Sequence, residues 1–102
     1  PRESDVAHFL TSISLAARVG ERLNKIEYGS LNSVVRAAQD SFLLSYENQS
    51  KALGLNPLNQ DLVSYLQLRQ YLFEIIYAVN YLPRWLYAPV ISLQQELGWA
   101  NG

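Results

Sequence analysis

Cysteine is absent from this 102-residue chain, and so is methionine. Without a cysteine thiol the chain can form neither disulfide bonds nor thiolate metal sites. Histidine occurs once, as His8, and no spacing of His, Asp and Glu is typical of a metal site. We therefore expect no metal ligands and no catalytic residue here. His8 lies on the expected first turns of a helix without a carboxylate partner in register, which favours a structural or surface role.

Clusters of positive charge and long apolar runs are also missing. Eight Lys and Arg against nine Asp and Glu give a formal net charge of −1, so we expect no nucleic-acid partner, because phosphate binding needs concentrated positive charge. No apolar run approaches the roughly 20 residues needed to cross a bilayer. The first residues do not have the layout of a signal peptide. These absences favour a cytoplasmic protein without a membrane partner.

Neither glycine-rich phosphate loop occurs in the chain, since the G-x-x-x-x-G-K-[ST] and G-x-G-x-x-G patterns are both missing. Hydrophobic residues make up 49% and charged residues 17% of the chain, which is typical of a globular domain. A chain of this length has room for one domain, which we expect to span residues 1–102. We therefore expect one folded domain that binds no cofactor by itself.

The hydrophobic periodicity predicts an all-α fold, a small bundle of about four helices. Apolar residues recur at helical spacing over residues 5–25, 31–53, 61–82 and 90–97. The predicted start and stop signals are Ser4 for the first helix, Ser30 or Asn32 and Gly54 for the second, Asn59 and Pro83 for the third, and Pro89 and Gly98 for the last.

The third predicted helix is apolar around most of its circumference, and we expect it to be the central helix of the bundle. The apolar positions that carry this expectation are Leu72, Phe73, Ile75, Ile76 and Val79.

Glu74 is the one acidic residue inside this apolar stretch, and a carboxylate in such surroundings needs a partner. Arg69, Arg84 or an arginine of a neighbouring helix could supply it. A structural ion pair and a ligand contact are both compatible with the pattern.

Aromatic residues gather where the third helix ends, at Tyr77, Tyr81, Trp85 and Tyr87. Aromatic faces can stack on the C–H faces of sugars, so this set could line a carbohydrate site. Aromatic residues at helical spacing also form hydrophobic cores. Both interpretations stay open on the pattern alone.

Three segments of the chain carry a family resemblance, in the same order and at compatible spacing. Their matching residues are Asp5, Val6, Ala7, Leu10, Ala16 and Ala17 in the first, Phe42, Leu43 and Tyr46 in the second, and Glu74, Tyr77, Asn80, Pro83, Trp85 and Pro89 in the third. In these segments the chain resembles the C-terminal helical part of maltokinases and of the related glucosamine kinases, which have an aminoglycoside-phosphotransferase-like fold.

The resemblance implies a helical C-lobe subdomain of a protein-kinase-like fold that shapes the acceptor-sugar pocket of an ATP-dependent kinase. It implies that Glu74, Tyr77 and Asn80 face the sugar substrate and that Trp85 packs beneath them. The family's nucleotide lobe and its catalytic and metal-binding segments would precede Pro1. ATP and Mg²⁺ are therefore expected for the whole enzyme and not for this chain, which by itself would not transfer phosphate.

The family's R-N-R segment is replaced here by Asn80-Tyr81-Leu82, so the resemblance does not name one sugar. The alternative from another class is a free-standing helical interaction module without catalytic activity. Its partner would bind an aromatic C-terminal face, which consists of Tyr81, Trp85, Tyr87 and Trp99.

Overall fold

Over the residues that the structure describes, the chain folds into four α-helices joined by short connections. The computed structural model describes residues 2–101, with side chains from residue 2 to residue 98. The elements are α1 (Arg2–Leu23), α2 (Asn32–Ala52), α3 (Gln60–Tyr81), a short 3₁₀ helix η1 (Pro83–Trp85) and α4 (Tyr87–Asn101). No β-strand occurs in the described range. The prediction of an all-α bundle of about four helices is confirmed.

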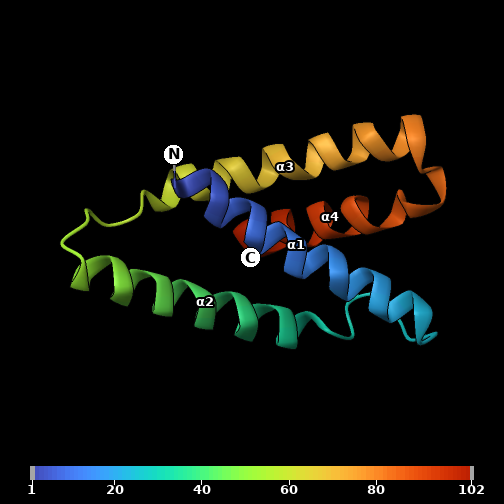
Figure 1. Cartoon of the computed structure of the whole chain (residues 1–102). Helices are drawn as coiled ribbons and strands as arrows, with labels where there is room; N and C mark the ends of the chain where they lie inside the picture. Colours follow the sequence, from blue (N-terminus) through green and yellow to red (C-terminus); the bar gives the residue numbers. More distant parts are fainter. Residues whose placement is uncertain (1, 102) are drawn as a thin grey trace.

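The central helix is α1, not α3 as the sequence pattern led us to expect. Figure 1 shows α1 between α2 on one side and the α3–α4 pair on the other, and α1 packs against all three. α3 packs against α1 and α4, and its other side is exposed, including Leu72, Phe73, Ile76 and Val79. The expectation was wrong because an apolar circumference shows how much surface a helix could bury, and not how much its neighbours cover.

The start of α3 and the end of α2 follow the predicted signals. Asn59 caps α3, since its side-chain oxygen accepts a hydrogen bond from the Leu62 amide at 3.1 Å. α2 ends at Ala52, two residues before Gly54, which adopts a φ of 73°. The Leu55 amide donates to the Ser50 carbonyl at 2.9 Å and the Gly54 amide to that of Lys51 at 3.0 Å. These two bonds form a Schellman motif, which favours glycine at this position.

Three other signals were wrong. α1 begins at Arg2, so Ser4 lies within the helix and does not cap it. α4 continues past Gly98 to Asn101, which is possible because a glycine costs a helix only about 1 kcal/mol. α2 has Leu31 at its N-cap and uses neither Ser30 nor Asn32. The carboxylate of Glu21, on α1, accepts the free Leu31 amide instead, at 2.8 Å.

The apolar core lies around the first half of α1. It consists of Val6, Ala7, Leu10, Leu58, Val63 and Leu66, with Phe42, Leu43, Tyr46 and Leu62 packed against it. The rings of Phe9 and Phe42 stack with centroids 4.3 Å apart, which joins α1 to α2. This cluster accounts for most of the apolar burial in the fold.

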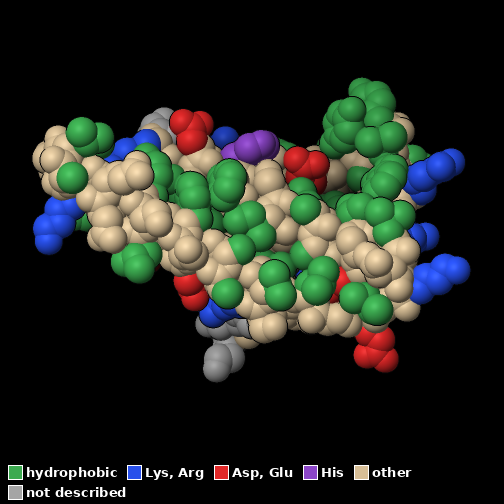
Figure 2. Space-filling view, turned by 60° about the horizontal axis from the view of Figure 1, so that its bottom comes forward, with side chains coloured by type: hydrophobic (Ala, Val, Ile, Leu, Met, Phe, Trp, Pro, Cys, Tyr) green, Lys and Arg blue, Asp and Glu red, His purple; other side chains and the backbone are tan. Residues whose placement is uncertain are grey.

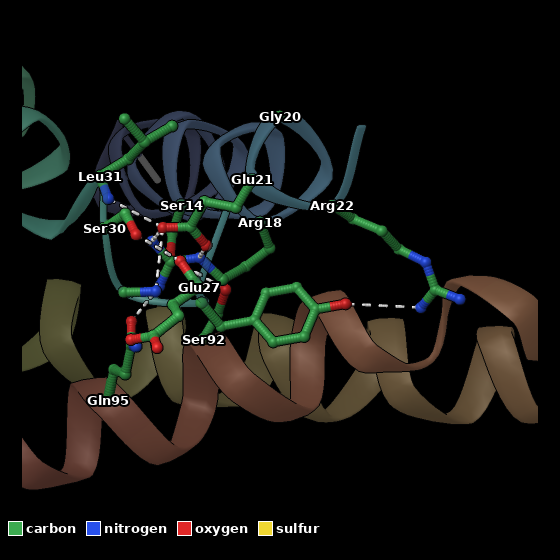
Figure 3. A network of polar contacts seen from close by, with 12 residues as sticks. Ser14, Arg18, Gly20, Glu21, Arg22, Glu27, Ser30, Leu31, Ser92 and Gln95 are labelled. Atoms are coloured by element: carbon green, nitrogen blue, oxygen red, sulfur yellow. Dashed lines mark hydrogen bonds and ion pairs between the residues drawn. The ribbon is translucent and has the colours of Figure 1, made fainter. Parts of the chain in front are cut away.

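The second half of α1 buries polar side chains instead, as Figure 3 shows. The hydroxyls of Ser14 and Ser92, on α4, are hydrogen-bonded at 3.0 Å. Arg18 and Glu21 are both fully buried and form an ion pair, with Nε and Oε1 2.7 Å apart. Arg18 also donates to the side-chain oxygen of Gln95 on α4. This network fixes α4 against α1.

Candidate functional site

A hollow of about 190 Å³ opens where α3 turns back into α4. Its walls come from α1, α3, η1 and the first turn of α4, and are almost entirely apolar. Three of the four residues predicted to contact a sugar lie in it, namely Glu74, Tyr77 and Trp85. The full lining consists of Leu15, Val19, Glu74, Tyr77, Ala78, Leu82, Trp85, Ala88 and Pro89.

The turn that forms this hollow follows from Pro83. Proline disfavours helical geometry at the residue before it, and Leu82 accordingly has φ −138° and ψ 61°. The chain then makes one 3₁₀ turn, in which the Trp85 amide donates to the Leu82 carbonyl at 2.9 Å. This tight turn places Trp85 in the lining of the same hollow as Glu74, Tyr77 and Ala78 of α3.

Glu74 has a different partner from the one that the sequence suggested. Its Oε1 accepts a hydrogen bond at 3.0 Å from the side-chain amide of Gln70, one turn earlier on α3. Arg69 instead places its guanidinium over the Phe73 ring, 5.2 Å from the centroid. Of the two interpretations that the sequence left open for Glu74, an ion pair with Arg69 or Arg84 does not form among the described residues, and the ligand contact stays a prediction. The second carboxylate oxygen of Glu74 has no protein partner among the described residues.

Tyr77 is about half exposed, and its ring lies 5.0 Å from that of Tyr81. Phe73, Glu74 and Tyr77 line a second, larger hollow of about 310 Å³ on the surface of α3. Glu74 and Tyr77 therefore belong to both depressions, so a ligand in either one can reach them.

Asn80 is not brought together with the other three. Its side-chain amide donates to the Ile76 carbonyl of its own helix at 2.8 Å, on the exposed side of α3. A sugar contact by Asn80 would require this amide to leave that bond, or a ligand that extends beyond the hollow.

A third depression of about 130 Å³ adjoins Trp85 on the side of α1. Arg22 lies over the Tyr87 ring, 4.4 Å from its centroid, and Tyr87 stacks on Tyr28 at 5.5 Å and on Trp85 at 6.4 Å. Partial burial raises the pKa of the Tyr87 hydroxyl, with Arg22 acting in the opposite direction. Figure 2 shows hydrophobic side chains and projecting Lys and Arg side chains gathered at this end of the molecule.

The contribution of α1 to this end was missed in the sequence. Leu15 and Val19 line the main hollow, and Arg22 lines the adjoining one. These residues are spaced i, i+4 and i+7, which places them on one helix face. The spacing can be read from the sequence, but it does not show that this face of α1 packs against the turn between α3 and α4. Tertiary packing decides that contact.

The arrangement suits a small neutral or cationic polar molecule. Aromatic rings offer faces for C–H stacking, and the Glu74 carboxylate can accept from a hydroxyl or an ammonium group. No group of three or more His, Asp or Glu side chains among the described residues could hold a metal ion. His8 is exposed on α1, away from these residues.

No helix over the described residues is both long and apolar enough to span a bilayer. No family model matches the chain, and neither does any solved structure. The chain is 33% identical to the glucosamine kinase of Mycolicibacterium smegmatis over 94 residues, which is 91% of this chain and 24% of that protein. It is also 33% identical to the glucosamine kinase of Streptacidiphilus jiangxiensis over 99 residues, which is 95% of this chain and 23% of that protein.

The chain thus spans about a quarter of the length of the curated relatives that it matches. The matched region includes nearly every described residue of all four helices. Over nearly its whole length the chain is therefore similar to a segment that makes up about a quarter of two glucosamine kinases.

Proposed function

We propose that this chain is the helical acceptor-side part of an ATP-dependent sugar kinase, a C-lobe subdomain that shapes the sugar pocket. The observation that carries the proposal is the convergence of Glu74, Tyr77 and Trp85 on one apolar hollow. The glucosamine kinases that match over almost the whole chain support the same class of substrate, a sugar or an amino sugar.

The mechanism would be positioning. Tyr77 and Trp85 would stack on the apolar face of the sugar, while Glu74 would accept from a hydroxyl or from the ammonium group of an amino sugar. Holding a sugar hydroxyl in one orientation towards a phosphate donor can supply a large part of the rate enhancement of phosphoryl transfer. ATP, Mg²⁺ and the catalytic residues would be held by other parts of the kinase.

The test is a chimaera in which this chain replaces the matching segment of the M. smegmatis glucosamine kinase. We expect Glu74→Ala and Tyr77→Ala to raise the KM for glucosamine about tenfold or more and to leave the KM for ATP unchanged. For Glu74→Ala, loss of a hydrogen bond to a charged group costs about 1.5–3 kcal/mol, which corresponds to that factor. Tyr77→Ala would instead remove the ring that stacks on the sugar.

Asp40→Ala is the matched control, because Asp40 is an exposed acid on α2, which does not line the hollow. Its two KM values should both stay unchanged. Equal increases in the KM of sugar and ATP for Glu74→Ala would count against the proposal. So would a folded chimaera with no kinase activity.

The free-standing interaction module is the second candidate. Tyr81 is 70% exposed, which supports a partner surface at this end. Trp85 and Tyr87 stack on one another within the chain, and the side chain of Trp99 lies outside the described residues. Light scattering separates the two candidates, because a dimer of the isolated chain that Tyr81→Ser dissociates would favour the module.

A further inference from the structure

The outer side of α3 carries an apolar stripe, interrupted by Arg69, that nothing in the described part of the chain covers. Along it Tyr65 is 60% exposed, Leu72 50%, Ile76 58% and Val79 58%. Phe73 flanks the stripe and is 51% exposed. The opposite side of the same helix is buried against the bundle through Val63, Leu66, Gln67, Tyr71 and Ala78.

The spacing along this stripe is that of a helix–helix seam. Its positions are 65, 69, 72, 76 and 79, which alternate in steps of four and three residues. This alternation is how a helix presents knobs to a second helix that packs along it. Arg69 is the one charged residue in the seam, and it lies over the Phe73 ring and not against an acid. The outer side of α3 is therefore shaped for a helix.

We propose that a helix from the catalytic portion of the sugar kinase packs along this stripe. The inference rests on the proposed function, and the length of the relatives supports it. The matching segment makes up 24% and 23% of the two glucosamine kinases, so about three quarters of each polypeptide lies outside it. Large exposed apolar patches are rare on monomers and mark interaction surfaces.

The position of the stripe relative to the candidate site gives the second argument. Phe73 flanks the stripe and also lines the open hollow of about 310 Å³ with Glu74 and Tyr77. Phe73 is the residue that the stripe and the hollow share, so a helix along the stripe would contact Phe73 and form one wall of that hollow.

A second copy of this chain is the other possible occupant, and it fits less well. A stable protein–protein interface buries about 800 Å² on each partner, spread over roughly 20–30 residues. A seam of five positions that includes an arginine would bury less area than such an interface needs. A segment of the same polypeptide does not lose the entropy of association, so a small seam suffices for it.

The experiment introduces two charges into the stripe with Leu72→Glu/Ile76→Glu. In the isolated chain we expect little change in Tm, because both side chains are already half exposed. In the chimaera with the M. smegmatis kinase we expect Tm to fall by about 5 °C or more, since the charges would be buried. The control is Leu44→Glu on α2, where Leu44 is 65% exposed. It should leave Tm unchanged in both proteins.

A milder variant tests the same contact without a risk to folding. The chain has no cysteine, so Leu72→Cys introduces the one thiol of this segment. We expect its alkylation, followed by mass spectrometry of the peptide that contains it, to be at least tenfold slower in the chimaera than in the isolated chain. The thiol of Leu44→Cys should react at similar rates in both.

The outcomes separate this inference from the proposed function. An active chimaera in which the Leu72→Cys thiol reacts as fast as in the isolated chain would overturn the packing of a kinase helix and leave the function standing. Protection of that thiol in an inactive chimaera would support the packing and count against the function. A dimer of the isolated chain that Leu72→Glu/Ile76→Glu dissociates would show that a second copy covers the stripe, and would overturn the inference.

Discussion

Glu21 is the residue on which the largest number of buried polar contacts depends. Its Oε2 accepts from the amides of Gly29 at 2.9 Å and Leu31 at 2.8 Å and from the Arg18 guanidinium at 3.0 Å. One carboxylate therefore neutralises a buried arginine and satisfies the amide of Leu31, the N-cap residue of α2. α2 has no side-chain cap of its own.

We expect Glu21→Ala to lower the free energy of unfolding by about 3–5 kcal/mol, because it leaves the Arg18 charge buried without a partner. The double variant Arg18→Met/Glu21→Leu should cost clearly less, since neither charge is then left unpaired. Urea unfolding at pH 7 measures both. Glu27→Ala, an exposed acid in the following loop, is the control. A double variant less stable than Glu21→Ala would contradict this account.

Glu96 is a residue whose charge should oppose folding. Burial raises the pKa of its carboxyl above the usual value of 4.5, and Arg36 acts in the opposite direction. The folded state then holds the proton more tightly than the unfolded state, so stability falls as pH rises from 4.5 through the higher folded pKa. We expect Glu96→Gln to be more stable than the parent chain at pH 7, with the difference shrinking towards zero near about pH 4.

Glu3 supplies a control of opposite sign for this pH series. The Asn59 amide donates to its Oε2 at 3.1 Å and lowers the pKa of the Glu3 carboxyl. Its contribution is present above pH 4.5 and is lost as pH falls, so Glu3→Gln should be less stable than the parent at pH 7. Urea midpoints at several pH values check both variants. A destabilised Glu96→Gln at pH 7 would refute the assignment for Glu96.

At the scale of single elements, two glycines have opposite roles. Gly20 lies within α1, and a Cβ there would meet the Leu31 Cδ1 at 3.8 Å, an ordinary contact. We expect Gly20→Ala to stabilise the chain by about 0.5–1 kcal/mol, because alanine loses less backbone entropy in a helix. Gly54→Ala should destabilise it by about 1 kcal/mol, since φ is +73° there. Thermal unfolding measures both, and the same sign for both variants would be the contrary result.

The ends of the helices could be predicted where the signal is local. Asn59 caps α3 with its own side chain, and Pro83 ends α3 through its own ring. The start of α2 could not be predicted in this way, because the group that satisfies Leu31 is Glu21, on another helix. Gly98 also gave a misleading signal, since the small penalty of a glycine does not by itself end a helix.

At the scale of the whole molecule, α2 is attached less firmly than the other helices. It packs mainly on α1, while α1, α3 and α4 all pack on one another. Its buried residues are limited to Val35, Gln39 and Ser50. We expect amide hydrogen exchange to be fastest in α2 and slowest in α1, because local opening follows the amount of buried contact. Equal protection of α1 and α2 in a mass-spectrometric exchange series would contradict this order.

The candidate site shows the same division between local and tertiary information. Glu74, Tyr77 and Trp85 were predicted to contact a sugar because they match a family pattern over a short stretch of sequence, and they do line one hollow. Arginines were named as possible partners of Glu74, and the side chain that donates to its carboxylate in the structure is Gln70. The contribution of Leu15 and Val19 to this hollow was not predicted, because it arises only when α1 packs against the turn between α3 and α4.

The order of residues was enough to establish that this chain is all-α, about where its four helices lie and which kinases it resembles. Those features depend on periodicity, local caps and residue identity, which are readable along one dimension. Packing in three dimensions was needed to establish that α1 is the central helix, that a buried Arg18–Glu21 pair joins α1 to the start of α2, and that one side of α3 stays exposed. The physical reason is that burial depends on which surfaces meet, and an apolar pattern does not specify its partner.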